Sequence, residues 1–222
     1  MINPNKYKAV IFDMDGVLID SEPLWKIAME EAFHSVGCMI TKKDFQKTVG
    51  LRIDEVITYW HQEVGWERLS VQDVENLIVQ KMIALIEDNG VPLPGVIDTL
   101  EYLKSKNIKL GLGTSSYNVL IEAVLNTLGI SSVFDVVHSA EDEEFGKPHP
   151  AVYLTVAQEL GVSPSKCLVI EDSFNGIISA LSARMTVVCI PEKTHTPDPK
   201  IEVANYQFAT MSLMLNHMKK QV

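Results

Sequence analysis

Short apolar segments alternate with helical patterns along most of this 222-residue chain, and the alternation limits the folds open to it. The apolar, β-rich segments lie at residues 9–12, 109–113, 133–137, 167–170 and 186–190. Helical spacing of apolar residues is found between them, at residues 96–104, 119–128, 151–160 and 176–183. Such alternation favours right-handed crossovers and a parallel sheet covered by helices on both faces. The sequence therefore predicts an α/β, Rossmann-like core.

Residues 21–89 depart from this alternation because their apolar periodicity is helical throughout. Three apolar stripes follow one another in this part of the chain, at residues 24–36, 53–64 and 74–85. Ser21 precedes the first stripe and is a candidate N-cap. We therefore predict a core made of residues 1–20 and 90–222, with an all-α cap inserted at residues 21–89. An insert directly after the first strand would lie above the carboxyl end of that strand and could act as a lid.

The charge and cysteine content narrow the function classes. With 29 acidic and 19 basic residues the formal net charge is −10, which argues against electrostatic binding of nucleic acid. The first residues lack the apolar core of a signal peptide, and no segment approaches the roughly 20 apolar residues of a membrane span. The 3 cysteines, Cys38, Cys167 and Cys189, have no metal-ligand spacing. We expect a cytoplasmic protein with no membrane contact, and the sequence leaves its oligomeric state open.

Two acidic residues follow the first predicted strand directly. Asp13 and Asp15 are separated by one residue, and Gly16 then permits a sharp turn. Ligands bind at the carboxyl edge of an open parallel sheet, so this pair could hold a metal and face a substrate there. The alternative is an ordinary strand-to-turn junction, in which Asp and Gly are common. An EF-hand loop fits worse, because its Gly stands at position six and a Glu at position twelve.

Polar residues also follow other strands or fill the loops between them. Thr114 ends the second strand, and Glu171 and Asp172 end the fourth, whereas Lys147 lies in a Gly-Lys-Pro loop. Each has a simpler interpretation: Thr114 could cap the next helix, with Ser115 or Asn118 in the same role, and the charged residues could be solvated. Taken together, an acid pair, a hydroxyl, a lysine and a second acid pair in this order favour one shared site.

This order resembles the haloacid dehalogenase superfamily of phosphoryl-transfer enzymes, over almost the whole chain. Its motifs are matched by a hydrophobic-Asp-x-Asp-Gly run, a hydrophobic-Thr strand end, Lys-Pro and Glu-Asp-Ser. The helical insert resembles the cap of the β-phosphoglucomutase-like subfamily. The segment Asp13-Met-Asp-Gly-Val-Leu-Ile-Asp-Ser-Glu-Pro-Leu-Trp25, with Gly50-Leu-Arg52, is similar to bacterial hexose phosphate phosphatases.

The resemblance implies a phosphatase that works through an aspartyl-phosphate. Asp13 would be the nucleophile, and Asp15 would protonate the leaving oxygen and then deprotonate the attacking water. The Thr114 hydroxyl and the Ser115 backbone N–H would bind phosphoryl oxygens. Lys147 would neutralise another and orient the nucleophile.

The same resemblance implies Mg²⁺ as the cofactor, bound by oxygen ligands. The expected ligands are the Asp13 carboxylate, the main-chain carbonyl of Asp15 and the Asp172 carboxylate. Glu171 is expected to bind the metal either directly or through a ligand.

Three further residues are candidates for contact with the substrate. Arg52 is expected to set specificity, because a cation at a helix start opposes the helix dipole and propensity does not explain it. The alternative is a solvent-facing arginine. Asn118 is placed in the same substrate-binding group. Trp25 could pack within the cap or stack on a sugar.

The predicted substrate is a small phosphorylated sugar, of the hexose 6-phosphate type. A β-phosphoglucomutase-type mutase is the nearest alternative, since mutases share all four motifs but carry a His where this chain has Trp25. Asp15 argues against dehalogenation and against carbon–phosphorus cleavage. The enzymes of the superfamily that catalyse these reactions lack an acid two residues after the nucleophile. A phospho-receiver-like protein or an inactive sensor of phosphosugars would be the non-enzymatic alternative.

Overall fold

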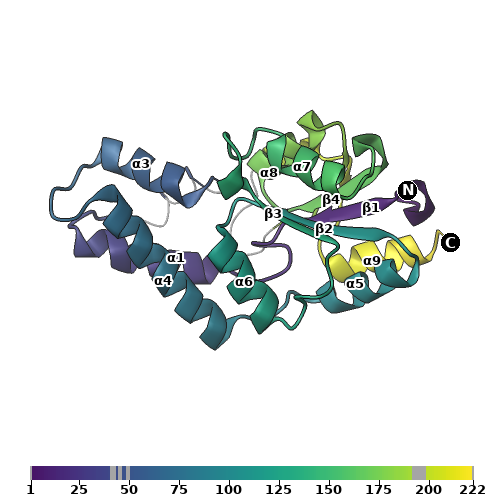
Figure 1. Cartoon of the computed structure of the whole chain (residues 1–222), viewed down its shortest axis with the longest axis horizontal. Helices are drawn as coiled ribbons and strands as arrows, with labels where there is room; N and C mark the ends of the chain where they lie inside the picture. The colour runs from purple at the N-terminus through teal and green to yellow at the C-terminus, as the bar shows by residue number, and fades with distance from the viewer. Residues whose placement is uncertain (1, 41–43, 45–46, 49–50, 192–198, 222) are drawn as a thin grey trace.

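A parallel sheet of 6 strands lies at the centre of the molecule (Figure 1). The computed structural model describes residues 2–40, 44, 47–48, 51–191 and 199–221. The strand order is β3-β2-β1-β4-β5-β6, and every neighbouring pair is parallel. The strands are β1 (Ala9–Phe12), β2 (Lys109–Thr114), β3 (Val136–Ser139), β4 (Cys167–Glu171), β5 (Thr186–Cys189) and β6 (Tyr206–Gln207). The predicted α/β core with a parallel sheet is confirmed.

Helices cover both faces of this sheet, as the near-continuous apolar strands require. On β1, Phe12 packs into the apolar cluster on one face, and Ile11 packs into the cluster on the other. Helices α7 and α8 lie on the Ile11 face, and α5 and α9 lie on the Phe12 face (Figure 1). Their bounds are α5 (Val96–Ser105), α7 (Ala151–Glu159), α8 (Phe174–Ser182) and α9 (Met211–Lys219).

The remaining helices gather at the end of the molecule toward which the strands point (Figure 1). These are α1 (Glu22–Ser35), α3 (Ile53–Glu63), α4 (Val71–Asn89) and α6 (Asn118–Thr127). Short 3₁₀ turns complete the described elements: η1 (Pro4–Lys6), η2 (Ala140–Asp142), η3 (Pro164–Lys166) and η4 (Pro199–Val203). The helical insert after the first strand is thus confirmed, while the division into domains at residues 20/21 and 89/90 stays a prediction.

The third strand lies later in the chain than the sequence predicts. The predicted segment is 133–137, whereas β3 is Val136–Ser139. Asp135 explains the shift, because its Oδ2 accepts a hydrogen bond from the Leu110 N–H at 2.7 Å. Phe134 turns toward the sheet and packs edge-on against Phe12, with ring centroids 6.0 Å apart. Regular pairing therefore begins only at Val136, opposite Gly111.

Two further sequence-based expectations need correction. The strand predicted at residues 186–190 ends one residue earlier, at Cys189. The two-residue strand β6, which the sequence does not predict, pairs with β5 and forms the edge of the sheet. Ser21 does precede α1, but its side chain makes no capping hydrogen bond. Its hydroxyl instead donates to Asp15.

Candidate active site

A cavity lies between the carboxyl ends of the central strands and the first helix of the insert. The core contributes Asp13, Asp15, Thr114, Ser115, Lys147 and Asp172 to its lining. The insert contributes Glu22, Trp25, Met29, Thr48, Leu51, Ile53 and Val56. Side chains from four separate parts of the core sequence therefore meet at the sheet edge that the strand-end pattern indicates.

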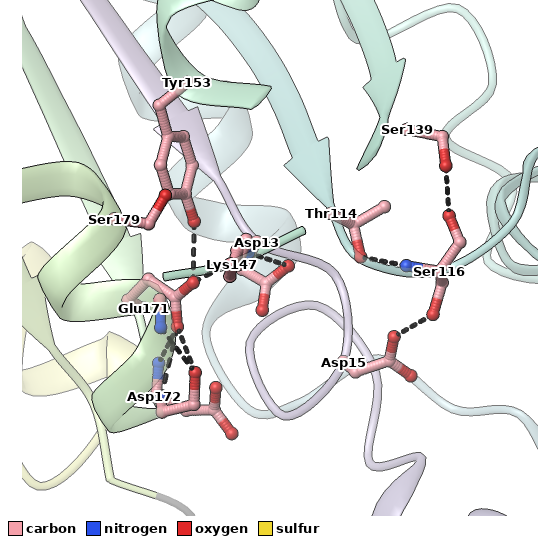
Figure 2. Close-up of polar contacts among 12 residues, drawn as sticks. Asp13, Asp15, Thr114, Ser116, Ser139, Lys147, Tyr153, Glu171, Asp172 and Ser179 are labelled. Atoms are coloured by element: carbon pink, nitrogen blue, oxygen red, sulfur yellow. Dashed lines mark hydrogen bonds and ion pairs between the residues drawn. The ribbon is translucent and has the colours of Figure 1, made fainter. Parts of the chain in front are cut away.

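Lys147 is buried between two carboxylates. Its Nζ lies 2.9 Å from Asp13 Oδ1 and 2.8 Å from Glu171 Oε1 (Figure 2). Lys147 is 2 % exposed and Asp13 is 7 % exposed, so water screens this ion pair weakly. The interpretation of Lys147 as a solvated loop charge is therefore wrong.

Both oxygens of Glu171 are occupied by donors from the protein. Oε1, which faces Lys147, also accepts a 2.6 Å hydrogen bond from the Tyr153 hydroxyl. Oε2 accepts from the Asp172 N–H at 3.0 Å and from the Ser173 N–H and hydroxyl at 3.1 Å. Gly176 makes room for this carboxylate, because a Cβ there would overlap Oε1. Glu171 is thus held in place as the buried counterion of Lys147.

Burial and charge shift the pKa values of this cluster in different directions. Burial raises the pKa of Asp13 to about 7, although the Lys147 ammonium opposes the shift. Burial alone would raise the pKa of Glu171, yet Lys147 and the Tyr153 hydroxyl bring it below the usual value. Burial would lower the pKa of Lys147, but Asp13 and Glu171 raise it overall. Lys147 is therefore a permanent cation at physiological pH.

The donor set fits a divalent metal ion. Asp13, Glu171 and Asp172 each offer a carboxylate oxygen, and these oxygens lie within 4.8 Å of one another. Gly16 has a φ of 68°, and a Cβ there would overlap the Asp172 carboxylate, so glycine allows this close approach. Oxygen ligands alone are typical of Mg²⁺. Both Glu171 oxygens already accept hydrogen bonds from protein donors, and whether Glu171 would bind the metal directly stays a prediction.

Asp15 points away from this cluster and toward hydroxyl and indole donors. Its Oδ1 accepts hydrogen bonds from the Ser21 hydroxyl at 2.6 Å and from Trp25 Nε1 at 2.9 Å. Its Oδ2 accepts from the Ser116 hydroxyl at 2.6 Å (Figure 2). Trp25, whose packing or stacking role the sequence left open, thus lines the cavity and contacts Asp15 directly.

The end of β2 and the loop after it contribute Thr114, Ser115 and Ser116 to the cavity lining. Thr114 is buried, and its Oγ1 accepts a 3.2 Å hydrogen bond from the Ser116 N–H. The Ser139 hydroxyl fixes the same loop by donating to the Ser116 carbonyl at 2.6 Å. Thr114 is not the cap of the next helix, since Tyr117 occupies the N-cap position of α6. The strand end therefore places Thr114 and Ser115 in the same cavity as Asp13.

Arg52 and Asn118 are not among the described residues that line the cavity, and the substrate contacts predicted for them stay a prediction. The Arg52 guanidinium donates to the carbonyls of Ala140 and Glu143, at 3.1 and 3.0 Å. Asn118 donates through its backbone and side-chain nitrogens to Glu141 Oε2, at 2.8 and 3.2 Å. Both side chains are drawn to the acidic loop that follows β3, which sequence spacing alone does not reveal.

Ser116 and Tyr153, which bond directly to Asp15 and Glu171, are among the contacting residues that the sequence-based prediction misses. Ser116 stands in the same short run as Thr114, so the Thr-Ser-Ser sequence gives a signal for it. Tyr153 lies on α7, whose position under β2 depends on Gly111 and Gly113. A Cβ at Gly113 would come within 3.3 Å of the Tyr153 ring. Two glycines in a buried strand are therefore a usable signal for a bulky side chain packed against it.

The sequence matches the haloacid dehalogenase-like hydrolase family over residues 7–184. The chain belongs to this family. Hexitol phosphatase B of Escherichia coli (strain K12) is 37% identical over 213 residues, which cover 96% of each chain. A phosphorylated carbohydrates phosphatase of Thermotoga maritima is 36% identical over 180 residues, covering 79% of this chain and 81% of that one.

Solved structures of the family agree with the fold. A β-phosphoglucomutase from Clostridium difficile superposes with a TM-score of 0.83 at 28% identity, covering 97% of this chain and 96% of that one. The family match and the phosphatase names of the relatives confirm the prediction of a phosphoric monoester hydrolase. They contradict the phospho-receiver alternative.

Among the residues that the structure describes, no helix is both long enough and apolar enough to cross a membrane. The cytoplasmic location stays a prediction.

Proposed function

We propose that this hydrolase is a Mg²⁺-dependent phosphatase of small sugar phosphates, of the hexose 6-phosphate type. The observation that carries the proposal is the placement of the Asp13 carboxylate. This carboxylate is largely buried and forms an ion pair with Lys147. It also lines a cavity to which Asp15 and Thr114 contribute. A carboxylate held this way can attack a phosphorus atom while a neighbouring acid manages the protons.

In the first step, an Asp13 oxygen forms a bond to phosphorus as the bond from phosphorus to the sugar oxygen breaks. Asp15 gives a proton to the departing sugar oxygen. Lys147 and the Thr114–Ser115 strand end stabilise the charge on the transferred phosphoryl group. The products are the sugar alcohol and an acyl phosphate on Asp13.

In the second step, a water oxygen attacks the same phosphorus atom and loses its proton to Asp15. The bond between phosphorus and the Asp13 oxygen breaks, which releases inorganic phosphate and regenerates the carboxylate. Asp15 has now regained the proton it lost. One carboxyl group thus serves both steps, because the leaving oxygen and the attacking water lie on the same side of the phosphorus atom, opposite Asp13.

Asp13 and Asp172 would hold the Mg²⁺, and Glu171 would support them from behind. When bound, the ion keeps Asp13 ionised near neutral pH and neutralises phosphate charge. This role is consistent with the raised pKa of Asp13 in the protein alone.

The cavity wall supports a neutral sugar or polyol as the leaving group. Helix α1 supplies Glu22, Trp25 and Met29 to this wall, which together offer an acceptor and apolar surface to a polyhydroxylated chain. The names of the relatives, hexitol phosphatase and phosphorylated carbohydrates phosphatase, support the same substrate class.

A phosphate-release screen with Mg²⁺ over hexose, hexitol and pentose monophosphates tests the proposal. We expect turnover of a hexose or hexitol 6-phosphate, loss of turnover with EDTA, and at least about a 10³-fold loss in Asp13→Asn. Asp20→Asn is the matched control, because Asp20 is exposed and lies in the same segment. An Asp13→Asn variant with near-normal kcat would overturn the nucleophile assignment.

The structural similarity to a β-phosphoglucomutase keeps a mutase as the second candidate. Incubation with β-glucose 1-phosphate and a trace of its bisphosphate separates the two functions. We expect free phosphate to form faster than glucose 6-phosphate. The reverse order would establish the mutase, and release of no product from any monoester would indicate an inactive sensor.

A further inference from the structure

The carboxylate of Asp15 accepts hydrogen bonds from three neutral donors, which come from two parts of the chain. Ser21 and Trp25 donate to Oδ1, and Ser116 donates to Oδ2. Ser21 is 1 % exposed and Ser116 is 7 % exposed, so water competes weakly for these bonds. Hydrogen bonds to a carboxylate are stronger than neutral ones, and three of them fix its orientation.

The two sides of this set differ in how they are anchored. Ser116 is fixed to the core, because its N–H donates to Thr114 Oγ1 and its carbonyl accepts from the Ser139 hydroxyl (Figure 2). Trp25 belongs to α1 and packs against the apolar cluster that also contains Phe12. The Asp15 carboxylate therefore connects the helical insert to the edge of the sheet.

We infer that Trp25 is a positioning residue for Asp15, acting through its indole N–H. This inference rests on the proposed function, in which Asp15 carries the proton in both steps. A carboxyl held by Ser21, Trp25 and Ser116 keeps one orientation in the cavity, the one from which it would reach the leaving oxygen. Without the indole donor the carboxyl samples other orientations, and proton transfer to the leaving group slows.

The choice of leaving group separates positioning from packing. A sugar alkoxide is a poor leaving group and needs protonation, whereas p-nitrophenolate departs without it. The parameter kcat/KM covers the steps up to the first irreversible one, so it reports formation of the acyl phosphate and not its hydrolysis. Loss of proton delivery therefore lowers kcat/KM for a sugar phosphate and spares that for p-nitrophenyl phosphate.

Trp25→Phe removes the N–H and keeps an aromatic ring in the cavity wall. We expect kcat/KM for the best sugar phosphate of the screen to fall about 5- to 20-fold, and that for p-nitrophenyl phosphate to change by less than about 2-fold. Trp60→Phe is the matched control. Trp60 is also buried in the insert, but its Nε1 has no hydrogen-bond partner within the described residues.

Ser116→Ala and Ser116→Thr repeat the test from the core side. Ser116→Ala should show the same selective loss, and Ser116→Thr, which keeps the hydroxyl, should restore activity toward the sugar phosphate. An equal loss on both substrates in Trp25→Phe, or no loss on either, would overturn the inference. Failure of the wild-type protein to hydrolyse any monoester would instead overturn the proposed function.

Discussion

The Tyr153 hydroxyl donates a hydrogen bond to the Glu171 carboxylate, which is fully buried. We therefore expect this hydroxyl to contribute to the stability of the folded protein. Tyr153→Phe leaves Glu171 with one donor fewer next to Lys147. We expect a loss of about 1.5–3 kcal/mol in the free energy of unfolding, measured by chemical denaturation. Tyr102→Phe is the matched control, because the Tyr102 hydroxyl oxygen is buried with no partner in the described part of the chain. Equal losses in the two variants would contradict the structural role given to Tyr153.

We expect the ionised Asp13 carboxylate to destabilise the metal-free folded protein at alkaline pH. Its pKa rises from an ordinary value of 3.8 to about 7, so the folded protein holds the proton more tightly than the unfolded chain. The resulting stabilisation is complete below pH 4 and is lost as the pH rises through 7. Asp13→Asn mimics the neutral form.

In EDTA, we therefore expect Asp13→Asn to melt at least about 2 °C above the wild-type protein at pH 8. The difference should disappear as the pH falls toward 4. Asp20→Asn should show no such pH-dependent gain. A melting temperature for Asp13→Asn at or below that of the wild type at pH 8 would rule out this cost.

At the level of single residues, the sequence predicts the meeting of Asp13, Thr114, Lys147 and Asp172 because three of them stand at or just after strand ends. Parallel strands bring such positions to one edge, whatever the rest of the chain does. Arg52 could not be placed in this way. Its side chain is oriented by carbonyls some 90 residues later in the chain, and helix periodicity carries no information about them.

The start of helix α3 is joined to the core by Arg52. Its guanidinium bridges two carbonyls of the loop after β3 and lies outside the cavity lining. Arg52→Ala should therefore lower kcat/KM by the same factor for sugar phosphates and for p-nitrophenyl phosphate. Steady-state kinetics on both substrates checks this, with Arg68→Ala as the control, since Arg68 is exposed in the same insert. A loss confined to sugar phosphates would support the specificity role predicted from the sequence.

Elements with strong periodicity were predictable, and the others were not. Helices α1, α3 and α4 follow the predicted apolar stripes closely. Strand β3 starts later because the Asp135 side chain, and not a backbone carbonyl, accepts the hydrogen bond from the Leu110 N–H. Strand β6 has two residues, which are too few to show the alternation of apolar and polar residues that identifies a strand in a sequence.

The whole molecule is acidic, and so is the described lining of its cavity. Lys147 is the one basic residue in the described lining of the cavity, and its ammonium group already pairs with Asp13 and Glu171. Asp13, Asp15, Glu22 and Asp172 are the acidic ones. A substrate with a second anionic group would thus meet no second basic side chain in the described lining to offset its charge.

We expect kcat/KM for glucose 1,6-bisphosphate to be at least about 10-fold below that for glucose 6-phosphate at low ionic strength. The gap should narrow with added salt, because the repulsion is screened. Initial rates of phosphate release at two salt concentrations measure it. Equal rates at low salt would mean that residues outside the described lining supply a cation.

The chain contains 3 tryptophans, Trp25, Trp60 and Trp66, and all of them belong to the helical insert. Intrinsic fluorescence excited at the indole band is therefore a signal from the insert alone, while circular dichroism records both parts of the molecule. A melt followed by both signals shows whether the insert and the sheet lose their structure together. The protein thus carries an intrinsic fluorophore, Trp25, in the part of the cavity wall that helix α1 supplies.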